Sequence, residues 1–297
     1  MKHIITSLVL ISILFGGLHA NDLAGQSAFI LRQAMGARPF GMAEVFTAIA
    51  DDPSAIYYNP AGLANVNERQ ADLMYWKGID DQAYLSVSFA DNIESIGNIG
   101  AGFLYYSGGT IEINFTDGTS EERNAQQDHV FYGAYGKQVL PWLSAGITAK
   151  AYFSKLVNEY SASAYAIDIG VLYDVKGINI AHCAQNIGTK LKYYEAEEKL
   201  PLVFRNGLSY NYIIDDMNNI IFGCDIIYRN QPLKTHIGAE YNYRNMLSLR
   251  TGYKIGYDLD SISLGAGFRK DKFMFDYGIG FMSEIGPTHR VSFGMQF

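Results

Sequence analysis

The chain has 297 residues and a formal net charge of −7. That length is enough for one large β domain or two ordinary ones. Only 18% of the residues are charged, whereas 14% are aromatic, and the chain holds 30 Gly and 22 Tyr. This composition is unusual for a soluble enzyme of this size. It also provides no basic surface for nucleic acid, so no nucleic-acid partner is expected.

The N-terminus has the features of a secretory signal peptide. Lys2 and His3 precede an apolar run over residues 4–18, and Ala20 supplies a small residue at a cleavage position. This arrangement predicts a signal peptide over residues 1–20, cleaved near Ala20. The run is shorter than a comfortable membrane span, although an uncleaved anchor is the alternative reading.

The segment over residues 36–63 differs from the rest of the chain. Met42, Phe46 and Ile49 have helical spacing, which predicts a short helix over residues 41–50. Asp51-Asp52-Pro53 should end it, and Pro53 should open a second helical turn. Asn59-Pro60-Ala61-Gly62 then predicts another break. The simplest reading is a helical lead-in packed on a soluble β domain.

From about residue 70 onward, apolar and polar residues alternate with period 2. In the last strand Val291, Phe293 and Met295 alternate with Arg290 and Ser292. About fourteen strands are predicted, over residues 69–77, 82–90, 97–106, 128–139, 142–154, 161–174, 177–185, 201–212, 218–229, 233–243, 247–256, 261–269, 272–282 and 288–297. Many have the 9–11 residues or more that a tilted transmembrane strand needs, whereas globular strands average about 5–6.

Two further patterns favour a membrane barrel over a soluble sandwich. Charges recur in mid-strand on the polar face, where they would line a lumen: Lys150, Asp168, Arg205, Asp225, Glu240, Arg250, Arg269, Asp276 and Arg290. Tyrosines gather near strand ends as candidate interfacial girdles, at positions 105–106, 210 and 212, 241 and 243, and 253 and 257.

The lengths of the connections point the same way. The two longest, over residues 107–127 and 186–200, both follow odd-numbered strands, and several connections after even-numbered strands are tight. Short periplasmic turns and longer outer loops are typical of outer-membrane barrels, which in bacteria have an even number of strands. The predicted fold is therefore an all-β membrane protein with an antiparallel transmembrane barrel of about fourteen strands.

One strand register follows from a turn. If residues 244–246 form a three-residue loop, Tyr243 faces Leu247 and Glu240 stands opposite Arg250. An opposed pair of opposite charges on one face is worth roughly 0.2–1 kcal/mol. The lumen charges are expected mainly to neutralise one another, with substrate binding as the alternative.

The chain resembles the PorV/PorQ-like outer-membrane proteins, relatives of FadL-type long-chain fatty-acid transporters. The matching residues are 24–28, 36–38, 41–42, 46–48, 50–52, 54–55, 59–63, 200–202, Arg205, Gly207, 238–241, 249–250, 252–253, 289–292 and Phe297. The resemblance covers nearly the whole mature chain, and its N-terminal part is the most specific. The chain departs from the family at residues 43–45, where relatives more often carry Gly or Ala beside Met.

The resemblance implies a bacterial outer-membrane location and three parts: a signal peptide (1–20), an N-terminal hatch folded in or under the lumen (21–66), and a transmembrane barrel (67–297). The expected hatch residues are Gly36, Arg38, Met42, Asp51, Asp52, Asn59, Pro60, Ala61, Gly62 and Leu63.

Two functions follow from the resemblance. The first is a component of type IX protein secretion that binds the C-terminal domains of secreted proteins or other secretion components. The alternative is a FadL-like transporter of hydrophobic small molecules, such as fatty acids or aromatics, by lateral exit through the barrel wall. Outer-membrane lipid is a partner in both. Inward-facing glycines, including Gly146, Gly170 and Gly252, could permit kinks in the wall or simply relieve crowding.

An enzymatic role is not expected. Of the possible catalytic bases, His129, His182, His236 and His289, none lies in a recognisable motif. The two cysteines, Cys183 and Cys224, show no metal-ligand spacing and lie on predicted strands that are not neighbours, so both are interpreted as unpaired apolar positions. No catalytic residue, metal or cofactor is predicted.

Overall fold

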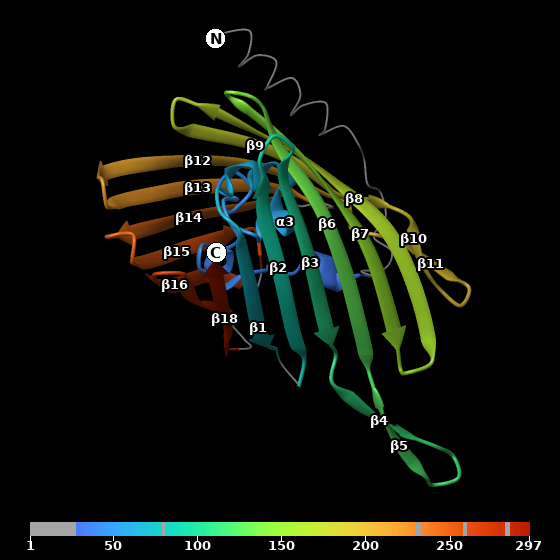
Figure 1. The fold of residues 1–297 in the computed structure, drawn as a ribbon. Helices are drawn as coiled ribbons and strands as arrows, with labels where there is room; N and C mark the ends of the chain where they lie inside the picture. Colours follow the sequence, from blue (N-terminus) through green and yellow to red (C-terminus); the bar gives the residue numbers. More distant parts are fainter. Residues whose placement is uncertain (1–27, 79–80, 230–232, 258–259, 283–285) are drawn as a thin grey trace.

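The computed structural model describes residues 28–78, 81–229, 233–257, 260–282 and 286–297. The predicted signal peptide and its cleavage site lie outside these residues. Fourteen antiparallel strands form a closed barrel, in which β1 pairs with β18 to complete the ring (Figure 1). The predicted barrel is thereby confirmed. None of the helices in the described residues is long and apolar enough to cross a membrane.

The barrel strands agree with the predicted ranges to within a few residues at each end, because the period-2 pattern continues through nearly every strand. They are β1 (Gln70–Lys77), β2 (Ala83–Ile93), β3 (Gly97–Ser107), β6 (Gln126–Leu140), β7 (Leu143–Leu156), β8 (Tyr160–Val175), β9 (Ile178–Gly188), β12 (Val203–Asp215), β13 (Asn218–Tyr228), β14 (Lys234–Tyr243), β15 (Leu247–Ile255), β16 (Asp260–Lys270), β17 (Phe273–Met282) and β18 (Gly286–Gln296).

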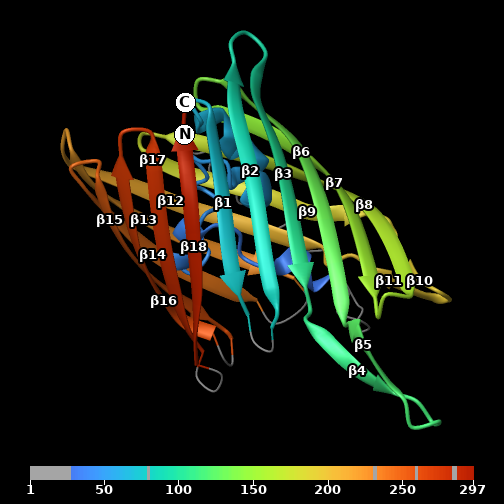
Figure 2. The same cartoon turned by 60° about the horizontal axis from the view of Figure 1, so that its bottom comes forward.

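The two ends of the barrel differ. One end, here called the turn end, carries the start of β1, the end of β18 and tight connections such as those after β6, β8 and β14. The other, the loop end, carries the two longest connections. Each of these folds into a small hairpin: β4 (Thr110–Asn114) with β5 (Ser120–Asn124), and β10 (Lys190–Tyr193) with β11 (Ala196–Lys199). The β4–β5 hairpin projects well beyond the barrel (Figures 1 and 2).

Side-chain alternation separates the inside of the barrel from the outside. On β1, Leu73 and Tyr75 are exposed on the outer surface, whereas Met74 and Trp76 are buried. On β18, Val291 is exposed and Ser292 is only 2% exposed. A continuous apolar exterior with polar and packed residues inside is the pattern of a barrel surrounded by lipid.

The chain from residue 28 to residue 66 lies inside the ring of strands (Figure 2). It contains four short helices: η1 (Phe29–Arg32), α2 (Ala37–Gly41), α3 (Ala55–Tyr58) and η2 (Pro60–Asn65). Most of its side chains are buried, and they form the centre of the main hydrophobic cluster. We call this described part of the predicted N-terminal segment the hatch.

The predicted helix over residues 41–50 is wrong. A short helix ends at Gly41, and residues 42–50 form a series of turns in which Ala43, Glu44 and Ala50 have positive φ. The apolar spacing of Met42, Phe46 and Ile49 is real, because all three are buried. The Phe46 amide, however, donates to Asp225 on the barrel wall, whereas the Met42 and Ile49 amides donate within the hatch. A local pattern contains no information on a partner as distant as Asp225.

Candidate functional site

The hatch is held by a belt of glycines on the barrel wall. At each of these positions an added Cβ would meet a hatch atom at 3.1 Å or less. The belt comprises Gly100, Gly102, Gly136, Gly146, Gly170, Gly207, Gly223, Gly238, Gly252, Gly265, Gly278 and Gly280, which lie on β3, β6–β8 and β12–β17. Glycine suits these positions because the hatch approaches the wall closely, with backbone atoms at some positions, such as Gly146 and Gly252, and with side chains at others, such as Gly100 and Gly280.

This belt decides between the two predicted roles of the inward glycines. A Cβ on Gly252 would lie 2.6 Å from the amide nitrogen of Ala43, and a Cβ on Gly238 would lie 2.6 Å from the carbonyl oxygen of Met42. The glycines make room for the hatch. Irregular strand pairing occurs at other places, such as between Ile167 and Ile169 on β8 and between Ile213 and Asp215 on β12.

Asn59 joins two hatch helices to each other and to the wall. Its Oδ1 accepts a hydrogen bond from the Ala61 amide at 3.1 Å and so caps η2, with Pro60 as the first residue of that helix. Its Nδ2 donates to the carbonyl oxygens of Thr47 (2.9 Å) and Val171 (3.3 Å). The predicted break at Asn59 is therefore a helix cap, a role for which Asn is well suited. Gly62 packs directly against Ala50, and Leu63 is fully buried.

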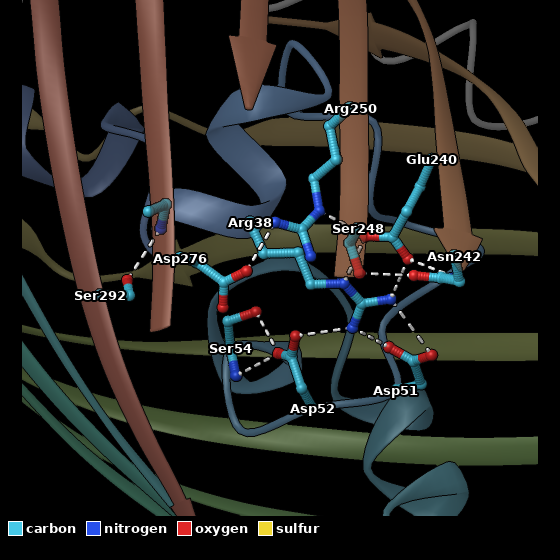
Figure 3. A network of polar contacts seen from close by, with 11 residues as sticks. Arg38, Asp51, Asp52, Ser54, Glu240, Asn242, Ser248, Arg250, Asp276 and Ser292 are labelled. Carbon is cyan, nitrogen blue, oxygen red and sulfur yellow. Dashed lines mark hydrogen bonds and ion pairs between the residues drawn. The ribbon is translucent and has the colours of Figure 1, made fainter. Parts of the chain in front are cut away.

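Arg38 ties the hatch to β14 through a branched ionic network (Figure 3). Its guanidinium contacts the carboxylates of Asp51 (2.6 Å) and Asp52 (3.0 Å) on one side and Glu240 (2.9 Å) on the other. Glu240 also accepts from Arg250 at 2.5 Å, and Arg250 continues to Asp276 at 2.5 Å. The network therefore crosses from the hatch through β14 and β15 to β17.

The register argued from the turn at residues 244–246 is confirmed. Tyr243 pairs with Leu247, and Glu240 pairs with Arg250. The contact between Arg38 and Glu240 could not be predicted from the strand pattern, because Arg38 lies 202 residues before Glu240 in the chain.

Specific partners hold Arg38 and Glu44 of the hatch in their ionised forms despite burial. Burial opposes the charged form of Arg38, but Asp51, Glu240 and Asp52 together raise its pKa well above the ordinary value. Burial would likewise favour the neutral form of Glu44, yet Lys254, with His236 and Arg229, holds the pKa of Glu44 below its usual range. Each group is compensated by specific partners, as buried charges require.

A second polar clamp holds residues 44–47 against β12, β13 and β15. One carboxylate oxygen of Asp225 accepts hydrogen bonds from the amides of Phe46 (3.3 Å) and Thr47 (3.1 Å) and from the Thr47 hydroxyl (2.5 Å). Arg205 donates to the Glu44 carbonyl oxygen at 2.8 Å and to Thr47 Oγ1 at 2.9 Å. Lys254 pairs with the Glu44 carboxylate at 2.7 Å.

The nine predicted lumen charges all lie on strands of the barrel. They do not form one cluster but several separate groups. Lys150 pairs with Asp168 at 2.7 Å and bonds Asn186, in the region where β8 and β9 pair irregularly. Arg290 on β18 donates to the Ala34 carbonyl oxygen and stacks on Phe40 with 3.9 Å between guanidinium carbon and ring centroid. Arg269 is exposed and lies in a cavity at the turn end.

That cavity has a volume of about 430 Å³. Gly36, Arg38, Asp51 and Asp52 line its hatch side, and the turn-end residues of β12–β18 and β1 line the rest. Its surface is mostly charged and amide groups. A cavity of this composition offers water and polar groups a place to bind below the hatch, and it offers little to an apolar molecule.

The inner wall toward the loop end is aromatic instead. Five rings from five neighbouring strands face inward there and are at most 8% exposed: Trp76, Tyr84, Tyr106, Tyr132 and Tyr152. Trp76 stacks on Tyr84 with centroids 4.0 Å apart, and Tyr84 contacts Tyr106 at 4.6 Å. Tyr57 of α3 packs edge-on against Tyr132 at 4.7 Å. We call these five residues the aromatic wall.

The aromatic wall was not predicted from the sequence, and two tyrosines were assigned to the wrong environment. Tyr106 and Tyr257 were expected in interfacial girdles, but Tyr106 faces inward and Tyr257 bonds the buried His236 at 2.9 Å. Tyr210, Tyr212, Tyr243 and Tyr253 are exposed on the outer surface, as a girdle requires. The alternation along β3 could have shown the orientation of Tyr106. This residue lies two and four positions after Leu104 and Gly102, which face inward.

The part of the chain that the structure describes contains no group of three or more His, Cys, Asp or Glu side chains able to hold a metal ion. Cys183 is buried and Cys224 half-buried, and both are free thiols.

Comparison with solved structures places the fold. No family model matches the sequence, and no curated protein matches it. The toluene transporter TbuX from Ralstonia pickettii aligns with a TM-score of 0.63 at 12% identity, over 89% of this chain and 98% of the other. The Pseudomonas putida toluene transporter TodX aligns with a TM-score of 0.62 at 13% identity, over 89% and 99%.

A FadL homologue from Pseudomonas aeruginosa also aligns, with a TM-score of 0.53 at 10% identity, over 89% of this chain and 98% of the other. At these identities the likeness is one of fold. This chain has the fourteen-stranded fold of the FadL-like outer-membrane barrels.

Proposed function

We propose that this protein is an outer-membrane β-barrel that passes small hydrophobic molecules, with aromatic compounds as its substrates. In this proposal the loop end faces the outside of the cell, the turn end faces the periplasm, and the chain acts without catalysing a reaction. Apolar solutes do not readily cross the polar outer surface of the membrane. A water-filled pore would not help them, because they also cross such channels slowly.

The observation that carries the proposal is the aromatic wall. Rings from β1, β2, β3, β6 and β7 gather at the loop end, on the far side of the hatch from the polar cavity. Sites for small apolar ligands are lined mainly by hydrophobic and aromatic side chains. The shared fold with two toluene transporters supports the same substrate class.

The apolar exterior and the fold both support an outer-membrane location with surrounding lipid. The role in type IX secretion, and with it the binding of secreted-protein domains, stays an untested prediction of the sequence resemblance. The comparisons favour the transport function over it.

Tryptophan fluorescence tests the proposal. The chain has two Trp residues, Trp76 in the aromatic wall and Trp142, which is 46% exposed on the outer surface. In a Trp142→Phe variant, Trp76 is therefore the single reporter. We expect para-bromotoluene, a heavy-atom quencher, to quench its emission saturably, and toluene to compete.

The control is the Trp76→Phe variant, in which Trp142 reports simple partition of the quencher into detergent. Quenching there should rise without saturation. If Trp76 shows the same unsaturable quenching, or if toluene does not compete, the aromatic wall does not bind such compounds. Uptake of labelled toluene by cells with the protein in their outer membrane should then match that of cells without it.

A further inference from the structure

A single inward-facing row of side chains crosses five neighbouring strands at the loop end of the barrel. Trp76, Tyr84, Tyr106, Asp128 and Ser154 are successive cross-strand partners on β1, β2, β3, β6 and β7. All five are buried, and Asp128 is 0% exposed. The first three are rings of the aromatic wall. The row therefore places a carboxylate and a hydroxyl directly beside that wall.

The carboxylate of Asp128 has neutral hydrogen-bond donors around it. It accepts from Ser154 Oγ at 2.5 Å and from Gln126 Nε2 at 2.8 Å. Among the residues that the structure describes, no basic side chain forms an ion pair with it. Because the single hydroxyl proton of Ser154 is donated to Asp128, Ser154 Oγ can only accept a further hydrogen bond. The pair therefore requires a donor from whatever packs against it.

In this structure that donor is a phenol from the β10–β11 hairpin. Tyr193 Oη donates to Ser154 Oγ at 2.5 Å. The hairpin lies beside β8 at the loop end (Figure 1), with Leu191 and Tyr193 on its inner face and Lys190 and Lys192 exposed. The half-buried Tyr193 ring packs against the hydrophobic cluster that includes the aromatic wall. The protein thus carries its own example of a phenol bound beside this wall, on a hairpin that is not part of the barrel sheet.

Further polar atoms of the aromatic wall are left without a partner. The indole nitrogen of Trp76 and the hydroxyls of Tyr84 and Tyr152 are buried, and none makes a well-formed hydrogen bond with a described residue. Leaving such a group unsatisfied costs about 1–3 kcal/mol. Tyr152 lies on the inner face of β7, two residues before Ser154, so it flanks a ligand bound at that serine. A hydrocarbon satisfies none of these groups, whereas a hydroxyl both donates and accepts.

We propose that Asp128 and Ser154 form a recognition site for a phenolic hydroxyl, and that hydroxylated aromatic compounds are the preferred substrates of the protein. The ring of such a compound packs on the aromatic wall, its O–H donates to Ser154 Oγ, and its oxygen accepts from the hydroxyl of Tyr152. Tyr193 and the substrate compete for the same acceptor. The choice of substrate rests on the proposed transport function, but the binding of phenols at this site does not.

Competition against the Trp76 fluorescence reporter tests the site. In Trp142→Phe protein, quenching by para-bromotoluene is displaced by para-cresol or by para-xylene, which differ only by a hydroxyl in place of a methyl group. The ratio of the two competition constants, compared between variants, cancels the different partition of the two compounds into detergent. Tyr193→Ala removes the internal competitor. Tyr194→Ala on the same hairpin is the matched control, since Tyr194 is 81% exposed.

We expect Tyr193→Ala to shift the ratio roughly tenfold toward para-cresol, which is about 1.4 kcal/mol, and Tyr194→Ala to leave it unchanged. Tyr193→Phe keeps the ring and loses its hydroxyl, so it should shift the ratio in the same direction by less. Ser154→Ala added to Tyr193→Ala should abolish the shift. Equal ratios in Tyr193→Ala and Tyr194→Ala, or a shift that survives Ser154→Ala, would overturn the phenol site.

Equilibrium dialysis with labelled para-cresol separates the site from the proposed transport. If the protein transports no aromatic compound, but Tyr193→Ala binds para-cresol and the double variant with Ser154→Ala does not, the proposed function fails and the phenol site holds. If toluene and para-cresol are both transported, but binding of para-cresol does not depend on Tyr193 or Ser154, the phenol site fails and the transport function holds.

Discussion

At the scale of single residues, glycine is the residue type on which the position of the hatch depends. The glycine belt allows the backbone and side chains of the hatch to pack directly on the strand backbone around most of the barrel. The sequence indicated that inward faces are rich in glycine, but only the contacts between the hatch and the wall distinguish close packing from kinks. The hatch atoms that fill the space come from positions 37–64, more than 30 residues away from every belt glycine.

We predict that Gly252→Val displaces the hatch. Its Cβ would lie 2.6 Å from both the Ala43 amide nitrogen and the Met42 carbonyl oxygen. Overpacking of this kind typically costs about 1–3 kcal/mol. The midpoint of urea unfolding in lipid vesicles should fall accordingly, and protease should cut the hatch of the variant more readily.

Gly133→Val is the matched control, because Gly133 lies on the outer surface of β6 with no atom within 4 Å of an added Cβ. Its unfolding midpoint should stay at or above that of the unmodified protein. Similar losses in both variants would show that valine weakens these strands regardless of the hatch.

The ionic network around Arg38 also includes a contact between hatch and wall that the sequence could not predict. The Glu240–Arg250 pair followed from the length of one turn, since a three-residue loop fixes which residues face each other. Arg38 could be assigned to the hatch but not to Glu240, because no local signal relates α2 to β14. Contacts within a hairpin are readable from sequence, whereas contacts between the hatch and the wall are not.

At the scale of elements, the strands and the second helical turn of the hatch were predictable, since α3 spans Ala55–Tyr58 shortly after Pro53. The first hatch helix was not. Alternation over ten or more residues is a strong signal, and it placed all fourteen barrel strands. The helical spacing in residues 41–50 was also genuine, but tertiary hydrogen bonds from Asp225 and Arg205 overrode it. Short segments enclosed by other elements are where propensity decides least.

The two faces of β13 provide a test of the strand assignment. Phe222 is 49% exposed on the outer surface, whereas Asn219 faces the polar cavity at the turn end. A charge on the lipid face is costly in a depth-dependent way, about 2–4 kcal/mol for Arg or Lys at the bilayer midplane and less for Asp. Phe222→Asp should therefore reduce assembly into the outer membrane, measured as the heat-modifiable band on gels.

Asn219→Asp introduces the same charge with almost no change in shape, and it should assemble normally because its side chain meets water and polar groups. A loss of assembly in Asn219→Asp as large as in Phe222→Asp would contradict the assigned inward and outward faces of β13.

At the scale of the whole molecule, the barrel has an apolar exterior, a polar cavity at the turn end, an aromatic wall at the loop end, and a hatch between the two. Strand parity and loop lengths predicted which end carries the turns, because both follow from connectivity alone. The opposite character of the two inner regions could not be predicted, since it depends on how far each inward side chain lies from the hatch along its strand.

The hatch occupies the lumen of the barrel, and ion conductance across planar bilayers tests this position directly. The unmodified protein should conduct little. Deletion of residues 36–63 with the signal peptide retained should give a barrel with a large and steady conductance, because the hatch fills the space between the strands. Replacing the β4–β5 hairpin by a short turn removes chain far from the lumen and should leave conductance low. A hatch deletion that assembles and still does not conduct, or an unmodified protein that conducts as freely as the deletion, would contradict the account.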